Sequence, residues 1–136
     1  MPHSSLPLVY SCSGCSNVAQ LANTLALRLD RSGLAEMSCI VGVGGHVAAL
    51  VNKARSGRRI LALDGCPLQC VEGCLNQHGL HADVHLILSH HGLRKRYGED
   101  CTEEQSDELF EEIRQLIASD GLQEENRMIE TSETMA

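Results

Sequence analysis

Aromatic residues are scarce in this chain of 136 residues. It has no tryptophan, and its only Tyr and Phe side chains are Tyr10, Tyr97 and Phe110. Platforms for single-stranded nucleic acids stack bases on several aromatic side chains, and flavin sites commonly stack the flavin ring in the same way. The shortage counts against both functions and predicts an aliphatic core.

A long apolar run and a secretion signal are also lacking. The longest mostly apolar run, residues 40–51, contains His46 and is too short to cross a bilayer. Residues 1–9 lack the basic segment and following apolar segment of a signal peptide. These absences predict a cytoplasmic protein without a membrane partner.

Acidic residues are few until the C-terminal end. Residues 1–98 carry nine Lys and Arg against five Asp and Glu, whereas residues 99–136 carry two against thirteen. We expect a single domain over residues 1–121 and an acidic, frayed tail over residues 122–136. The basic clusters are short and not interleaved with aromatics, so nucleic acid is not an expected partner. Protein partners and the oligomeric state stay open.

Cysteine, in contrast, is abundant. The seven cysteines are about 5% of the chain, below the roughly 8–10% of a small disulfide scaffold. Their odd number also fits poorly with complete disulfide pairing. In a reducing cytoplasm, clustered cysteines more often bind metal or carry out redox chemistry.

Short apolar segments alternate with helical patterns along the chain. We expect buried strands at residues 8–11, 37–43, 59–63 and 83–88, three helices that end near Gly33, Gly57 and Gly79, and a last helix that begins at Thr102. Continuously apolar strands that alternate with helices are typical of parallel sheets covered on both faces. The fold class predicted is α/β, a three-layer α/β/α sandwich with flavodoxin-like strand order 2-1-3-4.

Two cysteine pairs follow the first and third expected strands. Cys12 and Cys15 form one pair, and Cys66 and Cys70 form the other. In the order 2-1-3-4 these strands are neighbours, and their carboxyl ends meet where open parallel sheets bind ligands. A strand spacing of about 4.8 Å lets four sulfurs surround one ion at bond lengths of about 2.3 Å. We therefore predict that these four cysteines bind a metal ion, with zinc as the leading candidate.

The second pair has a local pattern of its own. Proline suits the first position of a helix, so Pro67 predicts Cys66 at the N-cap, with Cys66 and Cys70 on one face of the first turn. Gly14 and Gly65 allow the backbone to approach the site closely.

Five further residues are possible auxiliaries of the site. We interpret Cys39, inside an expected strand, and Cys74, one helical turn beyond Cys70, chiefly as core thiols. Asp64 could hydrogen-bond the loop or orient a ligand. His90 and His91 follow the fourth strand, where one could be a ligand or a base, although an exposed turn is the simpler interpretation. No catalytic residue is assigned.

These motifs resemble those of the DGC-domain proteins, a family regarded as zinc-binding. The similarity rests on residues 10–16, residues 37–45 and residues 63–70, which contain the triplet Asp64-Gly65-Cys66. It extends over roughly residues 8–120. The resemblance implies four chelating cysteines, which correspond here to the two pairs, and it implies no particular reaction.

Other uses of the same cysteines stay open. A complete four-cysteine shell leaves no position for water and favours a structural, regulatory or metal-handling role, whereas three sulfurs would leave zinc able to activate water near His90 or His91. An iron–sulfur cluster could replace zinc. Thiol–disulfide or persulfide chemistry is the alternative without metal.

Overall fold

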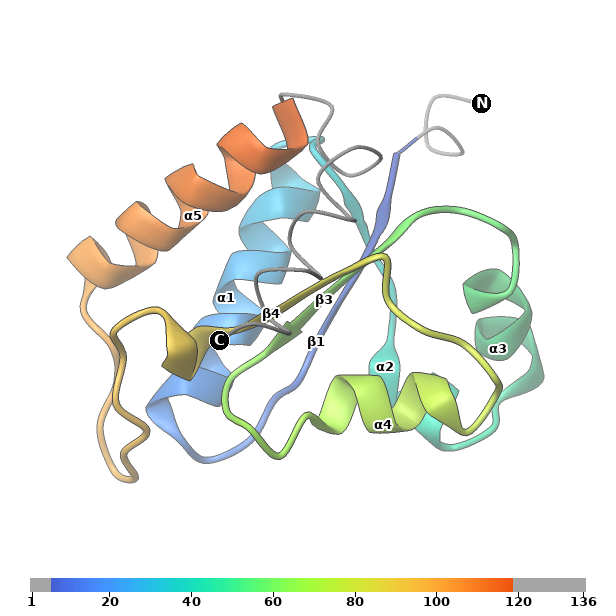
Figure 1. Cartoon of the computed structure of the whole chain (residues 1–136), viewed down its shortest axis with the longest axis horizontal. Helices are drawn as coiled ribbons and strands as arrows, with labels where there is room; N and C mark the ends of the chain where they lie inside the picture. Colours follow the sequence, from blue (N-terminus) through green and yellow to red (C-terminus); the bar gives the residue numbers. More distant parts are fainter. Residues whose placement is uncertain (1–5, 119–136) are drawn as a thin grey trace.

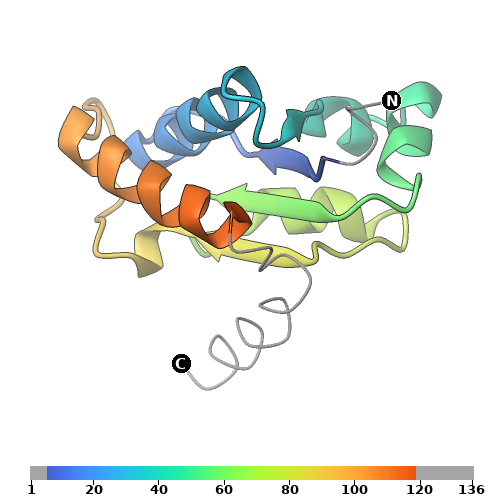
Figure 2. The same cartoon turned by 90° about the horizontal axis from the view of Figure 1, so that it is seen from above.

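The sheet contains four parallel strands in the order β2-β1-β3-β4. The computed structural model describes residues 6–118. Its strands are β1 (Leu8–Ser11), β2 (Glu36–Met37), β3 (Ile60–Asp64) and β4 (Val84–Ile87). Figure 2 shows β1, β3 and β4 running side by side. The predicted strand order and α/β class are confirmed.

Helices cover both faces of the sheet (Figure 1). On one face lie α1 (Asn17–Arg31) and α5 (Glu103–Ala118), and on the other lie α2 (Ile40–Gly44), α3 (Ala48–Ala54) and α4 (Cys70–Asn76). A short 3-10 helix, η2 (Leu88–His90), follows β4. The expected three-layer sandwich is therefore present.

Two aliphatic clusters form the core, one on each face. Successive strand side chains point to opposite faces, so Val9 and Leu61 pack beneath α1, whereas Leu8 and Ala62 pack beneath α4. Because both faces are covered, the strands are apolar at nearly every position.

Side-chain caps begin the two long helices. The hydroxyl of Ser16 accepts the backbone N–H of Ala19 at the start of α1. At the start of α5, Thr102 and Gln105 exchange reciprocal hydrogen bonds, which confirms the predicted capping box.

The strand predicted over residues 37–43 is wrong. Only Glu36–Met37 is extended, and the chain then turns into α2, whose N-cap is Cys39. A short apolar run is ambiguous between strand and helix. Here the sulfur of Cys39 accepts the N–H of Gly42 and caps the helix, and a Cβ at Gly42 would overlap Leu50 on α3.

The helix predicted to begin at Cys66 begins later, at Cys70. The N-cap is Gln69, whose φ of 55° is left-handed. The carboxylate of Asp64 accepts the N–H of Val71, so it takes one of the first unpaired donors of α4. Cys66 and Cys70 consequently do not share a helical turn.

The remaining expectations concern the ends of the chain and the membrane. The domain boundary at residue 121 and the tail over residues 122–136 lie outside the described residues. Among the helices of residues 6–118, none is both long and apolar enough to span a membrane.

Candidate functional site

The loops that follow β1 and β3 are hydrogen-bonded to each other. The backbone N–H of Cys12 donates to the carbonyl of Leu63 at 3.1 Å. The N–H of Gly65 donates to the sulfur of Cys12 at 3.2 Å. The structure thus brings Cys12 against the loop that carries Cys66 and Cys70.

Gly65 permits this approach because its backbone lies directly on the first turn of α1. A Cβ atom at this position would be 2.7 Å from the carbonyl carbon of Val18 and 2.8 Å from the nitrogen of Ala19. Only glycine fits so close to another backbone without displacing it. Gly65 therefore lies against the backbone of α1, and its expected close approach to a bound ion stays a prediction.

Electrostatics also connect Cys12 with the second pair. The pKa of the half-buried Cys12 thiol is raised to about 11, chiefly by burial; the hydrogen bond from Gly65 lowers it, and negative charge on Asp64, Cys70 and Cys66 adds to the rise. Negative charge at Cys66 or Cys70 therefore acts on Cys12. A cation among them would offset this mutual repulsion.

The fourth candidate sulfur is less constrained. Cys15 is exposed, as is Cys70, and all seven cysteines are free of disulfide bonds. Within residues 6–118, no three His, Cys, Asp or Glu side chains stand in an arrangement that could hold a metal ion.

A lysine that sequence reasoning missed lies beside the cysteines. The ammonium nitrogen of Lys95 donates to the sulfur of Cys66 at 3.4 Å. Hydrogen bonding to Tyr97, and then to Cys66, raises the pKa of Lys95. The cysteine loop after β3 therefore has a cation at its edge.

Asn17 holds the segment that carries this lysine. Its amide nitrogen donates to the carbonyl of Arg94 at 2.9 Å, and its amide oxygen accepts the N–H of Arg96 at 2.7 Å. The thiol of Cys101 also donates to the Asn17 carbonyl. Asn17 is buried, and the signal available in the sequence was only a polar residue at the start of an amphipathic helix.

Asp64 is buried beneath α4, and each of its carboxylate oxygens has a hydrogen-bond partner. One carboxylate oxygen accepts the N–H of Val71 at 2.9 Å, and the other lies 2.8 Å from Nε2 of His85 on β4. Asp64 therefore fixes the start of α4, the helix that carries Cys70. The sequence suggested a supporting role for Asp64 but gave no sign of its pairing with His85.

The other auxiliary residues occupy different positions. Cys39 is exposed at the N-cap of α2, which corrects its placement as a core thiol inside a strand. Cys74 is half-buried and its sulfur faces Gly44, where a Cβ would approach within 2.8 Å. His90 and His91 are exposed at the end of η2.

The family model for the DGC domain matches residues 8–113. The chain is 65% identical over 120 residues to a Pseudomonas aeruginosa protein named anaerobic and virulence modulator AnvM. The match covers 88% of this chain and 92% of the relative. No solved structure matches.

Proposed function

The chain belongs to the DGC-domain family, and on that premise we propose that it is a cytoplasmic zinc-binding protein with a regulatory role. Cys12, Cys15, Cys66 and Cys70 would hold the ion. The family resemblance and the two cysteine pairs both support this ligand set.

The bond from the Gly65 N–H to the Cys12 sulfur carries the proposal. It joins the two cysteine loops, and it is the kind of contact that stabilises a metal-bound thiolate. Cys15 and Cys70 are exposed, which leaves their side chains room to turn toward an ion.

The donor set suits a closed zinc site. Thiolates are preferred ligands of zinc, and four of them leave no position for water. Four thiolates with one Zn²⁺ carry a net charge of −2, and the Lys95 ammonium beside Cys66 would partly offset it. A closed site favours a structural or regulatory role over hydrolysis.

The regulatory part of the proposal rests on the relative from Pseudomonas aeruginosa. Its printed name describes a modulator, and the similarity covers most of both chains. We assign a corresponding role to this chain, with zinc stabilising the cysteine edge of the sheet.

Metal analysis of the untagged protein, purified without oxygen, tests the proposal. We expect one zinc per chain by mass spectrometry and a colourless solution. Cys12→Ser and Cys66→Ser should lose the zinc and melt at a lower temperature, because binding energy contributes to folding.

Cys101→Ser is the matched control, since Cys101 bonds to Asn17 and belongs to neither pair. It should keep the zinc. Brown protein with absorbance near 400 nm would show that the cysteines hold an iron–sulfur cluster instead of zinc. Full zinc occupancy in both Ser variants would refute the ligand assignment.

A second candidate, thiol–disulfide exchange, is favoured by the Lys95–Cys66 contact. A neighbouring ammonium stabilises a thiolate, the attacking species. Cys66 and a second thiol would pass two electrons and two protons to a disulfide substrate, forming one protein disulfide and two substrate thiols. Redox titration of folded, metal-free protein distinguishes this candidate, because a reversible two-electron couple is required.

A further inference from the structure

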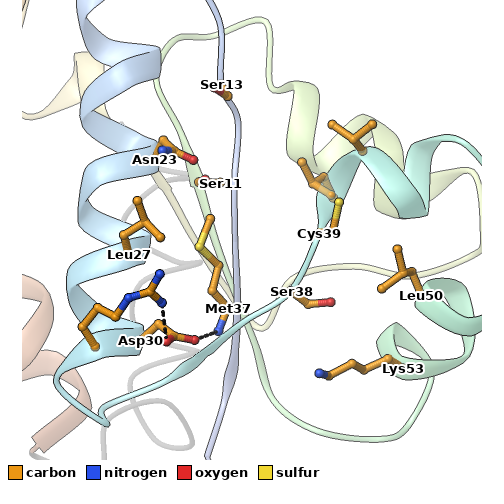
Figure 3. Close-up of a pocket in the computed structure, with 13 residues that line it drawn as sticks. Ser11, Ser13, Asn23, Leu27, Asp30, Met37, Ser38, Cys39, Leu50 and Lys53 are labelled. Atoms are coloured by element: carbon orange, nitrogen blue, oxygen red, sulfur yellow. Dashed lines mark hydrogen bonds and ion pairs between the residues drawn. The ribbon is translucent and has the colours of Figure 1, made fainter.

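A cavity of about 510 Å³ opens beside the short edge strand β2. Strand β2 pairs only with Leu8 and Val9, so Ser11 at the end of β1 pairs only with β3. The chain leaves β2 for α2 and exposes a space between α1 and α3. In Figure 3, Leu27 on α1 and Leu50 on α3 lie on opposite sides of that space.

Ser11 lines this cavity, and its buried hydroxyl has no hydrogen-bond partner among the described residues. Ser11 is 4% exposed, and its Oγ has no hydrogen bond to any atom of residues 6–118. An unpaired buried hydroxyl is costly, so a ligand group that hydrogen-bonds to it gains affinity. Ser13 and Ser38 add two further hydroxyls at the same edge.

Charges around the cavity are already paired with one another. Arg31 binds the carboxylate of Asp30 at 2.8 Å, and the same Asp30 accepts the N–H of Met37 (Figure 3). Lys53 binds Glu36. Asp30, Arg31 and Lys53 therefore already have partners of opposite charge, so we expect the cavity to take an uncharged ligand.

The remaining walls are apolar. Leu27, Ile40 and Leu50 line the cavity with Met37. The volume lies in the range of about 300–1,000 Å³ typical of small-molecule sites, and such sites combine apolar walls with a few polar groups. A ligand that fits has a short alkyl part and one hydrogen-bonding head.

We propose that this cavity binds a small uncharged molecule with a short alkyl chain and an amide or hydroxyl head, which hydrogen-bonds to Ser11. The site is separate from the zinc proposal, although both use the loop after β1. Cys39 lies at the cavity and is exposed, so its alkylation reports on occupancy.

Three probes of one shape test the proposal on the full chain: hexanamide, hexanoate and hexylammonium. We expect hexanamide alone to shift the backbone NMR signals of Ser11, Ser38 and Leu50 in a saturable manner. The same concentration should slow the alkylation of Cys39 by iodoacetamide.

Ser11→Ala should weaken hexanamide binding roughly twofold to tenfold, the effect of one hydrogen bond. It should still fold, because the hydroxyl it removes has no partner in the described structure. Ser89→Ala is the matched control, since Ser89 also has a buried, unpartnered hydroxyl but does not line the cavity. Leu27→Trp should fill the space and abolish binding.

Three outcomes would overturn the proposal. The first is the absence of shifts with hexanamide up to its solubility limit. The second is equal weakening, or none, in the two serine variants. The third is tighter binding of hexanoate or hexylammonium, which would show that charge and not the hydroxyl governs the site.

Discussion

Lys95 places its ammonium nitrogen 3.4 Å from the sulfur of Cys66, although 29 positions separate the two residues in the chain. The contact joins the segment after β4 to the cysteine loop after β3. It supplies positive charge where thiolates would accumulate negative charge.

Replacing Lys95 tests that charge. Lys95→Gln should weaken zinc binding about twofold to fivefold, the range for a solvent-accessible ion pair, and the difference should shrink as salt is added. Competition with a chromophoric chelator measures it. Lys95→Arg should keep most of the affinity, and Arg114→Gln on α5 should match the unmodified protein. Equal zinc affinities for all three variants would show that Lys95 does not contribute to zinc binding.

Asn17→Ala should destabilise the protein by about 2 kcal/mol, because it removes hydrogen bonds to Arg94 and Arg96 and leaves their backbone groups unpaired. Asn17→Asp should also destabilise the protein, since a buried carboxylate can accept from Arg96 but cannot donate to the carbonyl of Arg94. Urea unfolding gives the energies. If Asn17 positions Lys95, the Ala variant should also show the reduced zinc affinity of Lys95→Gln, and normal affinity would contradict this link.

Gly65→Ala should cost about 1–3 kcal/mol, because its Cβ would overlap the backbone of Val18 and Ala19. Gly73→Ala is the control. Gly73 lies within α4, and apart from its own helix backbone and chain neighbours no atom of residues 6–118 is within 4 Å of its Cβ position. This change should therefore stabilise the protein by about 0.5–1 kcal/mol. Thermal unfolding of the two variants gives the comparison, and shifts of the same sign would refute the close-approach argument.

Asp64→Ala should destabilise the protein by about 2–4 kcal/mol, since the N–H of Val71 and the ring of His85 lose a buried partner. Asp64→Asn should lose less stability, because its amide can accept from the N–H of Val71 and donate to one tautomer of His85. Hydrogen exchange at the Val71 amide reports on the first bond. Unchanged protection in Asp64→Ala would show that Asp64 does not fix the start of α4.

Glu36 predicts a pH dependence of stability. Its hydrogen bond from Lys53, and then that from Arg58, lower its pKa from 4.5. The stabilisation is therefore complete well above pH 4.5 and is lost as the pH falls through the lower folded-state pKa. Glu36→Gln should be less stable by about 1 kcal/mol at pH 7, and the difference should vanish in acid. Urea unfolding from pH 7 to pH 3 measures the free energy of unfolding of both proteins. A difference between them that does not change with pH would contradict the ion-pair explanation.

The long elements were predictable because their signals are local. The apolar spacing of α1 and the capping box of α5 need no information from elsewhere in the chain. The alternation of apolar strands and helices predicted a parallel sheet, and the flavodoxin-like strand order expected for it is the one observed.

Short elements were less predictable because distant contacts decide them. Residues 37–43 are apolar enough for a strand, yet they turn into α2, where Gly42 lies so close to Leu50 that a Cβ would overlap it. Pro67 favoured a helix start at Cys66, whereas the carboxylate of Asp64 caps α4 near Val71. Neither contact has a signature within the segment that it shapes.

By itself, the sequence determined the parallel sheet and the cysteine pairs that follow two of its strands, because both depend on hydrophobic periodicity and residue spacing along the chain. Only the tertiary structure decided that Lys95 meets Cys66 and that Asp64 meets His85. It also decided that Ser11 borders a cavity. These relationships depend on the packing of segments distant in sequence, since each requires a neighbouring strand or loop to bring the second residue into place.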